Sequence, residues 1–129
     1  MTTPAENKDV VRRFLKEISS GGNLDAIDEL VASNYVNRGM GNLDLAGFKA
    51  MLSGMQAASD VVIEDLVAED DAVVLRSTMN ITLGSGQKIS ARAITFYRLA
   101  GGRIVEDDTM TTPDLAQILG GQVPTLASP

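Results

Sequence analysis

Apolar residues recur at helical spacing near the start of the chain. They stand three or four residues apart and would form one stripe of a helix: Val10, Val11, Phe14, Leu15 and Ile18. Thr3 and Glu6 have the spacing of a capping box, and Pro4 between them suits the first helical position. The sequence therefore predicts a helix that begins after Thr3 and ends in the Ser- and Gly-rich residues 19–22.

Two shorter helices and one short strand are expected next. Asn23 has the residue type of a helix N-cap. Apolar residues follow it at helical spacing: Leu24, Ile27, Leu30 and Val31. Asn34 ends this second helix, residues 35–38 are extended, and a third helix is expected over about residues 44–57.

After Asp60 the apolar residues alternate with polar ones, which is typical of strands. Strands are expected at residues 61–68, 72–83, 87–99 and 103–112, and the short turns between them predict an antiparallel meander. Helices followed by strands indicate an α+β fold, in which the helices pack on one face of a curved sheet and leave a cavity at its open end. With a short helix over residues 115–119, residues 1–121 form one domain and residues 122–129 a loose tail.

The composition removes several kinds of chemistry. The 129-residue chain has no Cys and no His, which excludes disulfides, thiolate catalysis, a Ser-His-Asp triad and metal sites built on those ligands. Any proton transfer must use Asp, Glu, Tyr, Lys or a bound water. The net charge of −6 argues against nucleic acid or an anionic membrane as a partner. We see no membrane-spanning apolar run and no signal peptide, so we expect a cytoplasmic location.

The final strand contains the main candidate for catalysis. With strict alternation, one face of residues 103–112 carries Ile104, Glu106, Asp108, Met110 and Thr112. If this face lines the cavity, Asp108 is a carboxylate among apolar groups, where a raised pKa suits it to proton transfer. The alternative is a solvated or hydrogen-bonded Asp108 near a strand end. Adjacent strand residues point to opposite faces, so at most Glu106 and Asp108 act together, and we expect no metal.

Further residues are candidates for contact with a substrate. Arg38 would be a fixed cation that stabilises an enolate or orients a carboxylate, and a surface salt bridge is its alternative. Tyr35 and Tyr97 are the only tyrosines, and either would donate a hydrogen bond to a carbonyl or simply pack in the core. Thr112 shares the face of Asp108, but it also has the position of a helix N-cap before Pro113.

Six stretches between about residues 7 and 120 resemble one known family. They are residues 7–14 (NKDVVRRF), 22–31 (GNLDAIDELV), 69–73 (EDDAV), 96–99 (FYRL), 102–106 (GRIVE) and 117–120 (QILG). In this combination the chain resembles the SnoaL-like polyketide cyclases of the NTF2-like superfamily. The resemblance implies an α+β cone, in which a curved antiparallel sheet wraps around the N-terminal helices. It also implies a homodimer formed through the outer sheet face, and Arg76, Thr78 and Asn80 would face outward there.

The resemblance implies an intramolecular aldol condensation of a polyketide ester without any cofactor, but this chain departs from the family's catalytic residues. Arg38 stands where such proteins often carry a His, and Asp107 and Asp108 stand where a His-Trp pair is common. Thr112 falls at the position of the catalytic Asp, and Ser77 at that of a usual aromatic residue. Asp108 lies nearby on the same strand, so the chemistry is expected there.

Three interpretations follow. The first is an enzyme with cofactor-free acid/base chemistry, a cyclase, isomerase or lyase, acting on a small apolar carbonyl compound. Asp108 would move the proton, Arg38 or Tyr97 would stabilise the enolate, and the pocket would include Tyr35, Ser77, Met110 and Thr112. The second is a non-catalytic module that binds a small hydrophobic molecule, with Arg38 and Asp108 paired. The third is a dimerisation domain with a filled core.

Overall fold

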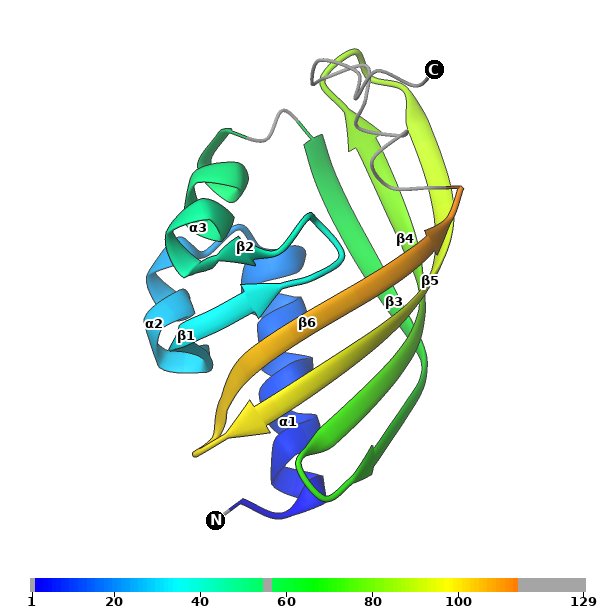
Figure 1. Ribbon diagram of the computed structural model, residues 1–129. Coiled ribbons are helices and arrows are strands. Elements are labelled where there is room, and N and C mark those ends of the chain that lie inside the picture. Colours follow the sequence, from blue (N-terminus) through cyan, green and yellow to red (C-terminus); the bar gives the residue numbers. More distant parts are fainter. Residues whose placement is uncertain (1, 55–56, 114–129) are drawn as a thin grey trace.

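A long helix and a curved sheet form the body of the protein (Figure 1). The computed structural model describes residues 2–54 and 57–113. The helical elements are α1 (Pro4–Phe14), the π-helical turn η1 (Leu15–Ser19), the 3-10 turn η2 (Leu24–Ala26), α2 (Ile27–Leu30) and α3 (Leu45–Gly54). The strands are β1 (Val31–Asn37), β2 (Leu43–Asp44), β3 (Ala57–Glu69), β4 (Ala72–Leu83), β5 (Lys88–Ala100) and β6 (Arg103–Thr112).

The first helix begins as predicted. The Thr3 side chain accepts a hydrogen bond from the Glu6 N–H at 3.1 Å, and the Glu6 carboxylate accepts one from the Thr3 N–H at 2.9 Å. This reciprocal capping box satisfies two backbone donors that have no partner within the helix. Most of the predicted stripe is buried, since Val11, Phe14, Leu15 and Ile18 are at most 6% exposed, while Val10 is partly buried.

The sheet has six strands in the order β2-β1-β6-β5-β4-β3. Strands β3 to β6 form the expected antiparallel meander, and β1 pairs with β6 in parallel. The prediction for residues 23–34 is wrong in two details. Asn23 makes no capping hydrogen bond through its side chain, and Val31 starts β1 instead of continuing α2. Val31 pairs with Ile104 of β6, a contact between residues far apart in sequence.

The concave face of the sheet holds the core. Figure 1 shows the long strands β3 to β6 curving past α1, while α2, α3, β1 and β2 gather at one side. Helix α1 contacts β3 and β4, and α3 contacts β1. Fully buried side chains from helix and sheet meet there, including Val11, Ile27, Val73, Leu75 and Ile104. The helices therefore fill one end of the concavity and leave the other end for a pocket.

Strand β6 departs from strict alternation at one residue. In its pairing with β5, Leu99 lies opposite Ile104 and Arg98 lies opposite Glu106, so Val105 is an extra residue in a bulge. Ile104 and Asp107 are both buried, although three positions separate them. Glu106 and Asp108, which were predicted to face inward, therefore do not belong to the pocket lining, because the bulge shifts the alternation by one residue.

Two predictions about the C-terminal part cannot be followed in the structure. The expected helix over residues 115–119 and the expected tail over residues 122–129, and with them the domain boundary at 121, lie outside the described residues. Across residues 2–54 and 57–113, none of the helices combines the length and the apolar character needed to cross a bilayer.

Candidate functional site

The open end of the concavity contains a pocket of about 330 Å³. Phe14 of α1 and Phe48 of α3 form one wall, with ring centroids 6.2 Å apart, and Tyr97 of β5 meets Phe14 edge-on at 6.1 Å. Met40, Met51 and Met79 add flexible apolar side chains to the lining. The volume falls within the range of small-molecule sites, and the walls are mainly apolar.

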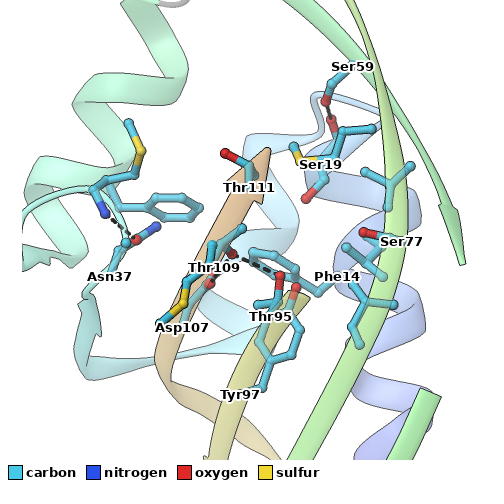
Figure 2. A pocket seen from close by; sticks show the side chains of 18 of the residues that line it. Phe14, Ser19, Asn37, Ser59, Ser77, Thr95, Tyr97, Asp107, Thr109 and Thr111 are labelled. Carbon is cyan, nitrogen blue, oxygen red and sulfur yellow. Dashed lines mark hydrogen bonds between the residues drawn. The ribbon is translucent and has the colours of Figure 1, made fainter. Parts of the chain in front are cut away.

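A short row of polar side chains crosses this apolar pocket (Figure 2). Asp107 and Thr109 come from β6, Thr95 comes from β5 and Ser77 comes from β4, and all four line the pocket. They occur at alternate positions of their strands and therefore point into the concavity. The sheet thus brings the polar groups of three strands to one place.

Asp107 lies at the centre of a hydrogen-bond network and is only 6% exposed. One carboxylate oxygen, Oδ1, accepts from the Thr109 hydroxyl at 3.1 Å, and the other, Oδ2, accepts from the Tyr35 hydroxyl at 3.3 Å. The Thr109 and Thr95 hydroxyl oxygens are 2.9 Å apart. A carboxylate has about four acceptor positions, so these two donors leave room for a ligand's N–H or O–H.

Burial changes the acidity of the groups in this network. Removal from water raises the pKa of Asp107 from 3.8 to about 6, although hydrogen bonds from Thr109 and Tyr35 oppose the rise, and the nearby Asp108 carboxylate adds to it. Burial also raises the pKa of both Tyr35 and Tyr97, and the negative charge of Asp107 adds to this effect. At neutral pH the phenols are therefore donors, while Asp107 can accept or release a proton near its pKa.

The connection between β1 and β2 closes tightly against β6 beside Asp107. The Arg38 N–H donates to the Asp107 carbonyl oxygen at 2.7 Å, and the Asn37 side chain accepts from the Met40 N–H at 3.1 Å. A Cβ atom added to Gly39 would lie 2.7 Å from the Thr109 carbonyl oxygen and 2.9 Å from its nitrogen. Glycine is therefore required for this close approach, which positions Met40 at the pocket.

The two residues predicted to be catalytic lie away from the pocket lining. Asp108 pairs with Phe96 in the ladder and follows Asp107 directly, so it faces the outer side of the sheet. Arg38 has a half-exposed side chain whose Nε lies 3.3 Å from Glu106 Oε2, which matches the surface salt bridge considered as its alternative. The structure therefore brings neither Asp108 nor Arg38 into the cavity, and it does not pair them with each other.

The residues predicted to contact a substrate divide into two groups. Ser77, Tyr97 and Met110 belong to the pocket lining, although the Met110 side chain is 72% exposed. Tyr35 reaches the site through its hydrogen bond to Asp107. Thr112 is exposed and lies opposite Arg92 in the ladder, and it does not belong to the lining.

Sequence reasoning missed several polar residues of the pocket lining, among them Asn37, Thr95, Asp107 and Thr109. One sequence feature could have found Asn37, because it stands two residues after Tyr35 and must share its face of a strand. Arg38 stands three residues after Tyr35, so the two side chains cannot both point into the pocket from a regular strand. The inward direction of Asp107 could be predicted only with knowledge of the bulge, and the sequence has no local marker for that bulge.

Within the described residues, no group of three or more Asp, Glu, His or Cys side chains is placed to hold a metal ion. Among the described residues, the lining offers a single carboxylate, Asp107, together with hydroxyl, amide and thioether groups. This arrangement can bind an apolar compound, donate hydrogen bonds to it through hydroxyl groups, and exchange one proton with it.

Comparisons with known proteins agree with this architecture. The model of one family, described as SnoaL-like polyketide cyclase, matches residues 9–119. No curated protein sequence matches the chain significantly. A solved structure of a provisionally assigned polyketide cyclase from Acidithiobacillus ferrooxidans superposes with a TM-score of 0.74 at 24% identity, covering 94% of this chain and 99% of that one.

Two other solved structures are similar over nearly their full length. An LEH-like epoxide hydrolase from M. tuberculosis has a TM-score of 0.74 at 19% identity, covering 95% of this chain and 98% of that one. The wild-type protein IdmH from Streptomyces antibioticus is also provisionally assigned as a polyketide cyclase. It has a TM-score of 0.70 at 21% identity, covering 87% of this chain and 97% of that one. At these identities the likeness establishes the shared fold alone, and one such fold serves different chemistries.

Proposed function

Because the chain belongs to the SnoaL-like polyketide cyclase family and has its NTF2-like cone fold, we propose that it catalyses cofactor-free acid/base chemistry on a small apolar carbonyl compound. The observation that carries the proposal is Asp107, a carboxylate 6% exposed in an apolar pocket, with a pKa raised by burial to about 6. A base with a pKa near the working pH is suited to proton transfer.

In the proposed reaction, Asp107 removes a proton from the carbon next to the carbonyl group. The C–H electron pair forms a carbon–carbon double bond, and the π pair of the carbonyl group moves onto its oxygen, which becomes the enolate oxygen. Tyr97 lines the pocket and its raised pKa keeps it protonated, so its hydroxyl would stabilise this oxygen by a hydrogen bond. In an isomerisation Asp107 returns the proton to another carbon. In an aldol cyclisation the enolate carbon attacks a second carbonyl group, and the proton goes to the new alkoxide.

Asp107 takes the role that the sequence suggested for Asp108. It stands at one of the positions where the resemblance places a His, so a carboxylate would replace an imidazole as the proton acceptor in this chain. Tyr35 and Thr109 would be positioning residues, because each donates a hydrogen bond that holds the Asp107 carboxylate in place and acts on the substrate through Asp107.

Proton exchange tests the proposal without knowledge of the natural substrate. The protein would be incubated in heavy water with a small apolar ketone such as 2-tetralone, and deuterium incorporation beside the carbonyl would be followed by NMR. We expect the protein to accelerate exchange, Asp107→Asn to abolish the acceleration, and Asp108→Asn to retain it. The rate should fall as the pH drops below about 6, because Asp107 becomes protonated. Equal exchange by Asp107→Asn and the parent protein would refute the proposal.

A second candidate is a binding module without catalysis. It is favoured by the two hydrogen bonds that Asp107 already accepts, since a carboxylate satisfied in this way can serve structure alone. A module of this kind would bind 2-tetralone but leave its exchange rate unchanged, so the same experiment separates the two functions.

We also propose a homodimer that forms through the outer face of the sheet. The proposal is supported by two apolar side chains that point outward from β3 and β5, namely Val67 (59% exposed) and Ile94 (50%). Apolar groups exposed together on one face favour a protein interface. Ile94→Glu should convert the dimer to a monomer in light scattering, whereas Leu24→Glu, an exposed change away from the sheet, should not. A parent protein that is monomeric at high concentration would contradict the dimer.

A further inference from the structure

The charge balance of the pocket is one-sided. All eleven Lys and Arg residues lie in the described part of the chain, and none of them lines the pocket. Arg38, which lies between the lining residues Asn37 and Gly39, turns its guanidinium toward Glu106 on the outside. At pH 7 a carboxylate with a pKa of about 6 is about nine-tenths ionised. Asp107 is therefore a buried negative charge that no cationic side chain of the lining balances.

The other titratable groups around Asp107 do not supply a positive charge either. Tyr35 from β1 and Tyr97 from β5 are phenols whose raised pKa values keep them neutral, and Asp108 from β6 is another acid. Thr95 and Thr109 contribute neutral hydroxyl groups. A second anion entering the pocket would add a repulsion that nothing in the lining opposes.

The walls of the pocket suit a positively charged group. Phe14, Phe48 and Tyr97 present aromatic rings, whose faces attract cations, and the Met thioethers are polarisable. The two hydrogen bonds to Asp107 are 3.1 and 3.3 Å long, so neither is a tight contact, and acceptor positions on the carboxylate stay open. The net charge of −6 would also draw a cation toward the protein.

We propose that this pocket selects compounds that carry a protonated amine on an apolar body, with the ammonium group beside Asp107 and the apolar body against Phe14, Phe48 and Tyr97. The natural ligand is then a basic compound, and a carboxylic acid of the same shape is excluded. The inference rests on the proposed function only where the basic compound is taken to be a substrate. Binding of an amine can be tested whether or not the protein is a catalyst.

A matched set of probes tests the charge preference by calorimetry at pH 7. The probes are 1-naphthylmethylamine, the neutral 1-naphthylmethanol, the anionic 1-naphthoic acid and the quaternary (1-naphthylmethyl)trimethylammonium ion. We expect the amine to bind at least about tenfold more tightly than the alcohol, because an ion pair in a partly dry site is stronger than a neutral hydrogen bond. The acid should bind most weakly. The quaternary ion separates charge attraction from hydrogen bonding, since it has no N–H.

Two variants and a pH series complete the test. Asp107→Asn should remove the preference for the amine, and Asp108→Asn, the same chemical change on the outer face, should keep it. In the parent protein the affinity for the amine should rise between pH 5 and 7 as Asp107 ionises, while the affinity for the alcohol should not rise. This series tests the idea in the parent protein, without any substitution.

The inference is overturned if the alcohol binds as tightly as the amine, if the preference survives in Asp107→Asn, or if none of the four probes binds. Its failure is distinct from failure of the proposed function. A pocket that prefers the neutral alcohol can still show exchange of 2-tetralone that depends on Asp107, and a pocket that prefers the amine can lack exchange altogether.

Discussion

Replacing Asp107 with Asn should make the protein more stable at neutral pH, although Asp107 is the proposed catalytic group. The carboxylate is 6% exposed, and burial raises its pKa from 3.8 to about 6. At about 1.36 kcal/mol for each pH unit, the pKa difference means that ionised Asp107 lowers the free energy of unfolding by about 3 kcal/mol. Asn has nearly the same shape and is never charged, so it avoids that cost.

The pH dependence gives the sign of the effect. Below pH 3.8 Asp107 is protonated in both the folded and the unfolded protein and costs nothing. As the pH rises from 3.8 to about 6, the unfolded state releases its proton first, so the free energy of unfolding of the parent protein falls. Above about 6 both states are ionised and the cost stays constant. The advantage of Asp107→Asn should therefore grow between pH 4 and 7 and then level off.

Urea unfolding of both proteins at a series of pH values measures this difference directly. All other titrating groups are shared, so they cancel when the free energy of unfolding of one protein is subtracted from that of the other. Loss of the hydrogen bonds from Tyr35 and Thr109 would lower the stability advantage of Asp107→Asn by about 1 kcal/mol at every pH. It would not create a dependence on pH. If the difference in the free energy of unfolding is constant from pH 4 to 8, the idea of a raised pKa for Asp107 is refuted. If the advantage of Asp107→Asn grows toward low pH, the pKa of Asp107 is lowered in the folded protein instead.

Two further substitutions test the packing and the capping of the chain. Gly39→Ala should cost about 1–3 kcal/mol in the free energy of unfolding, because its Cβ would meet the Thr109 backbone, while Gly54→Ala, where a Cβ meets nothing within 4 Å, should cost little. Thermal unfolding compares the two, and equal melting temperatures would contradict the close contact. Thr3→Ala should cost about 1 kcal/mol in urea unfolding by removing the capping box, and an unchanged midpoint would show that the cap is dispensable.

Much of the fold was predictable because its determinants are local. The capping box at Thr3 and the period-2 pattern of β4 and β6 depend on residues close in sequence, and both were predicted with correct starting points. Val31 shows where local information ends. An apolar residue fits the face of a helix as well as a strand, and its pairing with Ile104 of β6 decides between them. Val31 and Ile104 are far apart in sequence, so a short stretch of sequence cannot reveal that they pair.

The site was less predictable for the same reason. Tyr97 and Ser77, which the sequence suggested as substrate contacts, line the pocket, and the strand that it suggested for the carboxylate contributes Asp107 to the lining. Choosing between Asp107 and Asp108 required the position of an extra residue in the ladder between β5 and β6. A bulge is a property of two paired strands, so the sequence of one strand does not reveal it. Arg38 could have been rejected earlier, because Tyr35 and Arg38 cannot share one face of a strand.

The bulge at Val105 also bears on how this kind of pocket changes during evolution. If β6 kept strict alternation after Ile104, without the bulge, Glu106 and Asp108 would face inward in place of Asp107 and Thr109. Gain or loss of a bulge can thus replace the inward carboxylate without any substitution at that carboxylate. It follows that gap-free alignment of this strand does not transfer active-site residues between relatives. For protein engineering, placing or removing a bulge becomes a means of choosing which side chains face the ligand.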